Sequence, residues 1–365
     1  MGTQLSIQNT GSGYAAQSMG NSSAMQSMTS RLPTERNLAS VRSPVMLSRV
    51  ADNIYWMSRY LERAKQTARV LNVHLDLMLD QPEAAALQHR QFVLAGFQLP
   101  TKFAKAHDDY SLTNWLTFEE ENPNSIISCI AAARQNARQV RELISTEMWE
   151  QVNHLYLNVG QVQMDAMWSG EPSEFFQNVK EGIHLFIGLT DSTMNHGQGY
   201  HFIQAGRFLE RTIATAMMMQ VYYSPQEYLP KATAEKLLIN DQLLWAALLR
   251  SCTAFEAYSK IYTAELRPTA ILEFLLLNAE FPHSIAFAVR MTQLALQSIA
   301  DATYSPRTER AYRLAGRLHA DLQFGQVDEI QESGLDDYLK HLETNCIRIH
   351  DALYQSYITY PVDVE

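Results

Sequence analysis

The sequence predicts an all-α fold, a multi-helix bundle of about ten helices that includes long amphipathic helices. Three observations support this. Apolar side chains recur at alternating intervals of three and four residues through most of the chain. Prolines coincide with the breaks between the periodic segments. Only 15 glycines and 12 prolines interrupt 365 residues, and a β-rich chain of this length would need many more turns.

The first predicted helix is long and presents a narrow apolar seam to its neighbours. The seam begins at Leu47, passes Ile54 and Leu61 and reaches Met78, and Pro82 ends the helix. The segment 84–121 shows no clear pattern. Similar spacing predicts further helices over 122–144, 150–168, 172–194, 199–223, 231–263, 269–280, 282–302, 306–323 and 335–358.

The chain divides into a tail and one folded domain. Residues 1–45 are rich in Ser, Gly, Gln and Met and nearly free of large aliphatic side chains, so we expect them to be disordered. They contain no apolar signal-peptide segment, and the lack of arginine in the first 30 residues argues against a transit peptide. Residues 46–360 are expected to form a single helical domain.

Charge and cysteine content exclude several classes of function. The formal net charge is −10, and the tail carries +2, which leaves −12 for the remainder. A domain this acidic is a poor partner for nucleic acid. Cys129, Cys252 and Cys346 form no CxxC pair, which fits buried reduced thiols in a cytoplasmic protein. No apolar run is long enough to cross a membrane.

An internal repeat suggests an ancient duplication of a helical unit. The segment Arg59-Tyr60-Leu61-Glu62-Arg63 recurs as Arg207-Phe208-Leu209-Glu210-Arg211, and six of ten residues over 59–68 are identical at an offset of 148. An exposed helix flank has no physical need to keep charged residues in one order, whereas a semi-buried ion network does. We therefore expect the two helices to be neighbours, with Glu62 and Glu210 facing a shared concave region.

The residues that could form a binding site are mostly charged and lie on predicted helices. The alternative for each of them is a structural role, as a solvated helix flank or an aromatic packing residue. The candidates are Tyr55, Arg59, Glu62 and Arg63 on the first helix, Arg134 and Arg138 on a later one, Arg207, Glu210 and Arg211 on the second copy, and Glu256 and Tyr258 in a fourth segment.

Metal and cofactor motifs are weak. Glu181/His184 and Glu280/His283 have the spacing of the ExxH motifs that hold two metals in helical bundles, but Pro282 interrupts the second pair. We therefore expect no metal site. Signatures of phosphate loops, nucleophile elbows and zinc proteases are absent, so we expect no cofactor and assign no catalytic residue.

Segments 46–64, 133–142, 206–211 and 254–258 together resemble the bacterial alpha-E family, an all-helical domain, over residues 46–358. The chain departs from the family at Pro282-His283-Ser284, where the resemblance implies Pro-Arg-Ser. This difference puts an anion-binding role at that position in doubt. Family members also tend to begin near Met46, so the true start is either Met1 or Met46.

The resemblance implies a setting rather than a mechanism. Alpha-E proteins tend to be encoded beside, or fused to, a circularly permuted ATP-grasp protein and a transglutaminase-like protease. The first hypothesis is therefore an interaction or substrate-holding subunit that works with an ATP-grasp ligase on peptide-like amide bonds. A stand-alone enzyme that uses Glu62 or Glu210 as general acid or base is the alternative, and a metal-carboxylate bundle is a third. Substrate and oligomeric state stay open.

Overall fold

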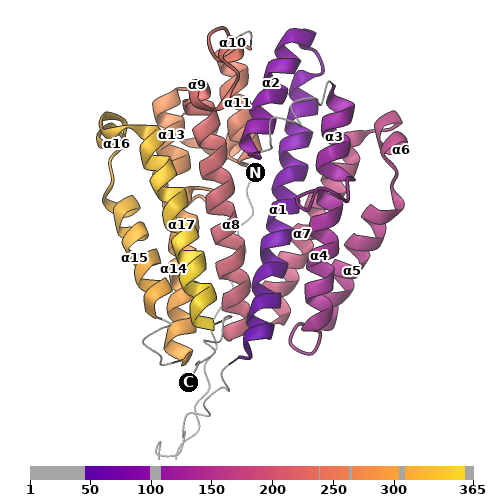
Figure 1. The fold of residues 1–365 in the computed structure, drawn as a ribbon, viewed down its shortest axis with the longest axis vertical. Helices are drawn as coiled ribbons and strands as arrows, with labels where there is room; N and C mark the ends of the chain where they lie inside the picture. Colours follow the sequence, from indigo (N-terminus) through magenta and orange to yellow (C-terminus); the bar gives the residue numbers. More distant parts are fainter. Residues whose placement is uncertain (1–45, 99–107, 238, 263–264, 304–308, 358–365) are drawn as a thin grey trace, which may run out of the picture. The chain divides into compact units, whose positions relative to one another are not determined.

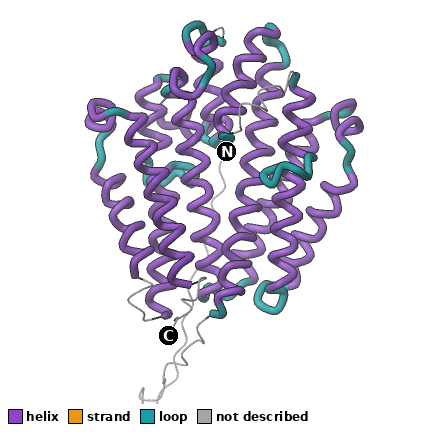
Figure 2. Tube along the Cα trace, in the orientation of Figure 1, coloured by secondary structure: helices purple, strands orange, loops and turns teal. Residues whose placement is uncertain are grey.

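The computed structural model describes residues 46–98, 108–237, 239–262, 265–303 and 309–357, all within one compact unit that spans 44–365. Every regular element among these residues is a helix, which confirms the all-α prediction (Figure 2). The described residues form seventeen helices, so the expectation of about ten was too low. The predicted disordered tail, 1–45, lies outside the described residues.

The helices fall into two consecutive sets. The first set is α1 (Ser48–Met78), α2 (Glu83–Gly96), α3 (Asp109–Thr117), α4 (Ile126–Gln139), α5 (Thr146–Gln161), α6 (Met164–Ser169) and α7 (Pro172–Thr193). The second set is α8 (Gln198–Tyr223), α9 (Pro225–Tyr228), α10 (Lys231–Ala234), α11 (Asp241–Ser251), α12 (Phe255–Tyr262), α13 (Pro268–Leu277), α14 (Ile285–Thr303), α15 (Glu309–Phe324), α16 (Val327–Ser333) and α17 (Leu335–Tyr357).

Three of the seven extra helices come from predicted helices that the chain breaks, and the other four, α2, α3, α9 and α16, lie outside the predicted ranges. The predicted helix over 231–263 is three helices, and the last two, α11 and α12, are separated by Thr253, which adopts a left-handed backbone conformation (φ 58°). The predicted helix over 150–168 begins at Thr146 and is interrupted after Gln161. The unreadable segment 84–121 contains α2 and α3.

The two sets repeat one packing pattern. In the first, α1 and α5 each pack against both α4 and α7, and in the second, α8 and α15 each pack against both α14 and α17. The helices α1 and α8 lie side by side at the centre, with α4 beside α1 and α17 beside α8 (Figure 1). This arrangement is what a duplicated helical unit predicts.

Matching serine residues begin the corresponding helices α4 and α14. The Ser125 hydroxyl accepts a hydrogen bond from the Ser128 amide, and the Ser284 hydroxyl accepts one from the Phe287 amide. Each serine follows a proline by two residues, in Pro123-Asn124-Ser125 and Pro282-His283-Ser284. The equivalence of these two loops matters for the site, because each loop meets a charged residue of the central helices.

The helices α1 and α8 run parallel and approach closely at Gly206. Residue numbers rise together in the contacts between them: the Met46 amide donates to Gln198 Oε1 near the start of both helices, and Arg59 pairs with Glu210 farther along both. A Cβ atom on Gly206 would lie 2.6 Å from the Tyr55 carbonyl oxygen and would also collide with the Ser58 hydroxyl. The absence of a side chain at this position sets the spacing of the two helices.

We predict that Gly206→Ala lowers the free energy of unfolding by about 1–3 kcal/mol or more, because the methyl group must push α1 and α8 apart. The matched control is Gly188, which is exposed on α7 and where an added Cβ atom would meet nothing within 4 Å. There the same substitution should raise stability by about 0.5–1 kcal/mol through helix propensity. Urea unfolding of both variants tests the contrast, and equal effects would contradict the close approach.

Candidate functional site

Two arginines of α1 saturate Glu210, the glutamate of α8. Arg59 Nε donates to Glu210 Oε2 and Arg63 Nε donates to Glu210 Oε1, each at 2.7 Å. Arg59 and Glu210 are each only 7% exposed. Burial opposes ionisation of Glu210, but the two arginines outweigh it and hold the pKa of the carboxyl below its usual value. The carboxylate is therefore ionised and fully paired.

A reciprocal cluster forms around Glu62, the glutamate of α1. Arg211 Nε on α8 donates to Glu62 Oε1 at 2.7 Å, and Lys65 Nζ donates to Glu62 Oε2 at 2.8 Å. Burial raises the pKa of Glu62, yet Arg211 and Lys65 hold it well below its usual value. Burial also lowers the pKa of Lys65 to about 8, even beside this carboxylate.

The two clusters follow the repeat in one contact and depart from it in another. Arg63 with Glu210 and Arg211 with Glu62 are equivalent pairs at the offset of 148. Arg207 is the counterpart of Arg59, but Lys65 takes its place at Glu62. Among the described residues the buried Arg207 Nε has no hydrogen-bond partner, and its guanidinium lies over the Phe208 ring at 4.5 Å.

The equivalent loops before α4 and α14 complete the clusters. Arg63 Nη1 donates to Asn124 Oδ1 at 2.6 Å, and Arg211 Nη1 donates to the Pro282 carbonyl oxygen at 2.8 Å. Burial and then Arg211 lower the pKa of His283 well below its usual value. His283 is therefore neutral, and it adds no cation to the Glu62 cluster.

Tyr55 and His350 extend the Glu210 cluster. Arg59 Nη1 donates to the Tyr55 hydroxyl at 3.3 Å, and this hydroxyl lies 3.0 Å from His350 Nδ1. The Arg59 guanidinium also lies 4.7 Å from the ring centre of Trp56. Burial raises the pKa of Tyr55 to about 12, so the phenol is protonated and acts as a hydrogen-bonding packing group.

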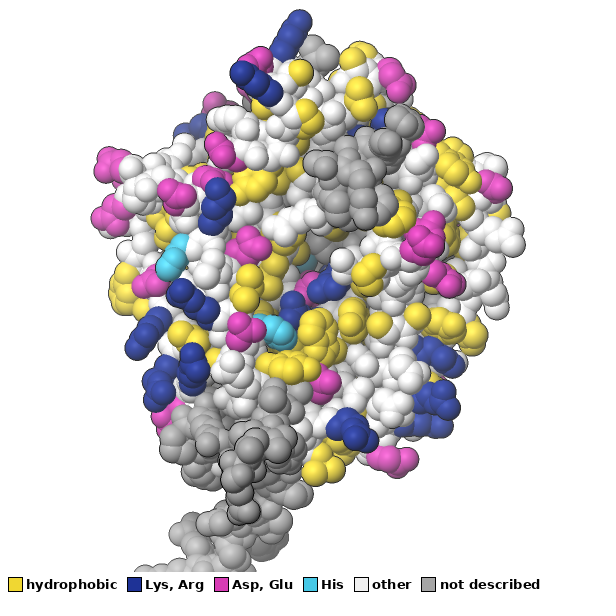
Figure 3. Space-filling view, viewed as in Figure 1, with side chains coloured by type: hydrophobic (Ala, Val, Ile, Leu, Met, Phe, Trp, Pro, Cys, Tyr) yellow, Lys and Arg dark blue, Asp and Glu magenta, His cyan; other side chains and the backbone are white. Residues whose placement is uncertain are grey.

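A cavity of about 330 Å³ opens beside the Glu210 cluster. Arg59, Arg63 and Glu210 form its polar wall, and residues of α8 such as Met217 form an apolar one. Figure 3 shows the molecule from the side drawn in Figure 1, and on it basic, acidic and histidine side chains gather around a hollow near the middle. Glu62 does not line this cavity. The prediction that α1 and α8 are neighbours is thus confirmed, and this cavity contains only Glu210 of the two glutamates.

The remaining candidate residues lie elsewhere. Arg134 faces α5, where its Nε donates to Asn153 Oδ1 at 2.7 Å, and Arg138 is exposed. Tyr258 is fully buried, and its hydroxyl donates to the Glu265 carbonyl oxygen at 3.0 Å. It is a core residue. Glu256 is exposed and lines a different cavity beside α1.

A buried histidine chain escaped the sequence analysis, because its members are far apart in sequence. His74 Nε2 lies 2.9 Å from Asp109 Oδ1, and His74 Nδ1 lies 2.8 Å from His89 Nδ1. His89 Nε2 lies 3.0 Å from the Tyr222 hydroxyl. One assignment satisfies every atom: His74 protonated on Nε2, His89 protonated on Nδ1, and Tyr222 donating to His89. His89 is then neutral.

Metal ligation finds no support in the described residues, where no three His, Cys, Asp or Glu side chains gather in a way that could hold an ion. Glu181 of the first ExxH pair accepts a hydrogen bond from Gln177, at 2.6 Å. His283 of the second lies beside the Glu62 cluster. None of the described helices has the length and apolar character needed to span a membrane.

We predict that Glu210→Gln lowers the free energy of unfolding by about 3–5 kcal/mol, because Arg59 stays buried without its counter-charge. Glu309→Gln is the matched control, since Glu309 pairs with Arg313 at 3.1 Å with both side chains more than half exposed. Its effect should stay below about 1 kcal/mol. Denaturant unfolding measures both, and a Glu210 variant as stable as the control would show that the cluster contributes nothing.

A second prediction concerns acid. Burial lowers the pKa of His89 well below its usual value. As the pH falls below about 6.5, the unfolded chain binds a proton at this residue that the folded chain does not. Stability contributed by neutral His89 is thus present at neutral pH, and is lost at up to about 1.4 kcal/mol per pH unit.

The test compares unfolding free energies across this pH range. His89→Gln should give a flatter pH dependence than the natural chain, at a lower absolute stability. His341→Gln, a change at an exposed position of α17, should leave the dependence as it was. If the His89 variant retains the full slope, His89 is protonated in the fold and the assignment above fails.

Comparison with known proteins identifies the family of this chain. The alpha-E family, described as a predicted alpha-helical domain with a conserved ER motif, matches residues 46–358. One uncharacterized protein of Mycobacterium bovis and two of Mycobacterium tuberculosis are each 22% identical over 329 residues, covering 84% of this chain and 35% of theirs. The chain thus spans about a third of the length of these curated relatives. No solved structure matches it.

The Glu62-Arg63 and Glu210-Arg211 dipeptides are the Glu-Arg pairs that cross between the two central helices. The family match covers nearly all of the described residues. The chain belongs to the alpha-E family.

Proposed function

We propose that the chain is an interaction or substrate-holding subunit that works in the cytoplasm with a circularly permuted ATP-grasp amide ligase, and in some systems with a transglutaminase-like protease. The joint task is to form or modify peptide-like amide bonds. ATP-grasp enzymes join a carboxylate to an amine through an acyl phosphate, so the ligase would supply the chemistry and this chain the binding. The three cysteines, which are buried free thiols, are compatible with a reducing compartment.

The observation that carries this proposal is the saturation of both glutamates. Each oxygen of Glu62 and of Glu210 accepts a hydrogen bond from a cationic side chain. A general acid needs a proton to give, and a general base needs a lone pair that a substrate can reach. Neither glutamate offers these. The motif is thus better suited to fixing α1 against α8 than to catalysis.

The same saturation disfavours the stand-alone enzyme. In that alternative Glu62 or Glu210 would change protonation state during turnover, yet their pKa values are held below the usual range by adjacent cations. Removing a cation to free the carboxylate would also leave a buried charge without a partner. A rigid frame with polar cavities on its flanks fits a holding role more directly.

The length of the relatives is a second support. About two thirds of each curated relative lies outside the matched region, so in those proteins the domain is joined to other regions of the chain. A domain that works together with a second protein is expected to be fused in some cases to another domain, as in these relatives.

We predict that this chain alone hydrolyses no ATP, and that it co-purifies with the circularly permuted ATP-grasp protein of its own organism or raises that protein's ATP turnover. The measurements are pull-down of the tagged ligase and ADP release with and without the chain. A heat-unfolded sample of the chain is the control for non-specific effects. If the folded chain neither binds the ligase nor alters ADP release, the proposal is wrong.

A further inference from the structure

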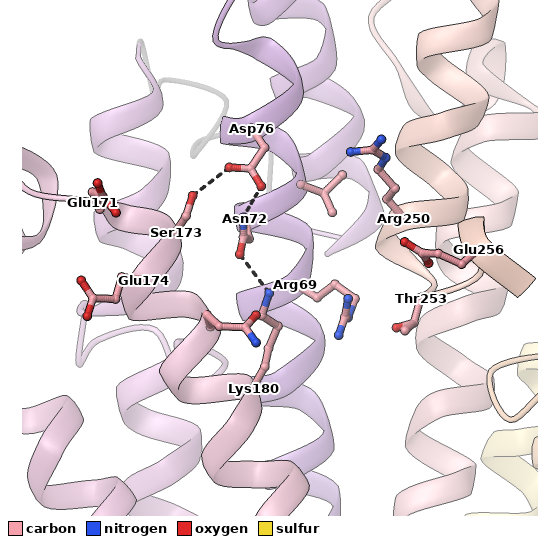
Figure 4. Close-up of a pocket in the computed structure, with 12 residues that line it drawn as sticks. Arg69, Asn72, Asp76, Glu171, Ser173, Glu174, Lys180, Arg250, Thr253 and Glu256 are labelled. Carbon is pink, nitrogen blue, oxygen red and sulfur yellow. Dashed lines mark hydrogen bonds between the residues drawn. The ribbon is translucent and has the colours of Figure 1, made fainter.

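A polar cavity of about 470 Å³ lies between α1, α7 and the turn that joins α11 to α12 (Figure 4). It is separate from the cavity beside Glu210, and no residue of the two Glu-Arg pairs lines it. Its volume is within the range of small-molecule sites. Charged side chains dominate its walls: Arg69, Lys180, Arg250, Asp76, Glu171, Glu174 and Glu256.

Two cations at the inner wall form no ion pair with a carboxylate of the described residues, although Glu256 acts on Arg69 and Asp76 acts on Lys180 from a longer distance. Lys180 is buried, and its Nζ donates to the neutral Asn72 Oδ1 at 2.9 Å. Arg69 is half-buried, and in the part of the chain that the structure describes its guanidinium makes no ion pair or hydrogen bond. Burial and then Arg69 lower the pKa of Lys180, while Asp76 and Glu181 raise it.

This situation contrasts with that of the neighbouring cations on the same helix. Arg59, Arg63 and Lys65 all lie against a carboxylate. A partly buried cation is costly unless a counter-charge offsets its desolvation. The pair formed by Arg69 and Lys180 therefore has the electrostatics of a receptor for an anionic group.

Thr253 supplies an independent sign of a binding site at the opposite wall. Its φ of 58° is in the left-handed region, which a β-branched residue rarely adopts and where glycine would be the ordinary choice. Its buried Oγ1 has no hydrogen-bond partner among the described residues. In Figure 4 the Arg69 guanidinium extends toward this threonine. Strain of this kind persists at sites that use the residue.

The acidic side chains limit what the anion can be. Asp76 is occupied, since it accepts hydrogen bonds from Ser173 Oγ at 2.8 Å and from Asn72. Glu256, Glu171 and Glu174 are exposed at the rim. Three cations face four carboxylates, so the cavity as a whole does not favour a polyanion such as phosphate. A ligand that carries one negative and one positive group suits both parts.

We propose that this cavity binds a small zwitterion of the amino-acid class, with its α-carboxylate on Arg69 and Lys180 and its α-ammonium toward Glu256. An α-amino acid is a substrate that an amide ligase joins to a carboxylate. The inference thus deepens the proposed function and rests on it for its biological role, although the binding itself does not.

The test measures ligand binding to the full chain alone. Each of the twenty amino acids, glycylglycine and inorganic phosphate is screened by its shift of the melting temperature, and hits are titrated by calorimetry. We expect an amino acid to bind, and its carboxamide and its N-acetyl derivative each to bind at least tenfold more weakly, or about 1.4 kcal/mol. Binding of phosphate alone, or of none of these probes, would overturn the proposal.

Variants then assign the contacts. Arg69→Gln and Lys180→Gln should each weaken the amino acid at least tenfold, while Arg138→Gln, at an exposed position outside the cavity, should change its affinity less than twofold. Glu256→Gln is at an exposed position and should not affect folding. It should weaken the amino acid but leave the N-acetyl derivative unaffected. Unchanged binding in the folded Arg69 and Glu256 variants would refute the assignment.

The two proposals fail separately. If the amino acid binds but the ligase is neither bound nor stimulated, the cavity assignment stands and the partnership does not. If the ligase is bound but none of the amino acids or glycylglycine binds, the partnership stands and this cavity is not its substrate site.

Discussion

The contact between α1 and α8 fixes the position of everything else in the described structure. Helix α1 packs against α4 and α7 of its own half, and α8 packs against α14 and α17 of the other half. Between α1 and α8 lie buried charges that must find partners. Arg59 and Arg63 reach Glu210, while Arg211 reaches Glu62 in the opposite direction. Sliding one helix by a single turn would leave all of these ions unpaired in an apolar interior, at several kcal/mol each. The ion pairs therefore select one register, a role distinct from adding stability, since apolar side chains of similar size often pack as favourably.

The duplication is visible in the helix packing, but the two halves have diverged at their charges. On the Glu210 side the repeat's own arginines fill both carboxylate oxygens, and Asn124 accepts a further hydrogen bond from Arg63. On the Glu62 side, Lys65 has replaced the contact that Arg207 would make by symmetry. That side holds a surplus of cations, and burial followed by Lys65 lowers the pKa of His184 to about 4. The cavity of Arg69 and Lys180 lies farther along the same helix α1, so the divergence and the unpaired cations occur in one region.

Helix class and the pairing of the central helices could be predicted from sequence, for identifiable reasons. Periodic apolar positions such as Ile54 and Leu61 are an intrinsic property of a buried helix face, and the shared order of Arg, Glu and Arg reflects a physical pairing. The turn at Thr253 could not be predicted, because neither glycine nor proline marks it. The chain of His74 and His89 was missed for another reason: α1 and α2 must first fold against each other before the two imidazoles meet. Lys65 was overlooked because it looks like a surface residue until its depth is known, at 2% exposed.

The same physical reasoning decides which charged residues are informative about function. A charge whose partner is present within the fold has its desolvation already offset, so its presence is explained by the fold alone. This applies to Glu62 and Glu210, although they were the leading candidates from sequence. A partly buried cation without such a partner, or a β-branched residue in a left-handed turn, raises the energy of the native state and persists only where the surrounding structure holds it. Arg69 and Thr253 meet that condition on opposite walls of one cavity. The saturated pairs on α1 and α8 provide the rigidity that such a site requires. An unpaired glutamate on either helix could move toward Arg69 and supply the missing counter-charge, whereas Glu62 and Glu210 are already held by their own cations.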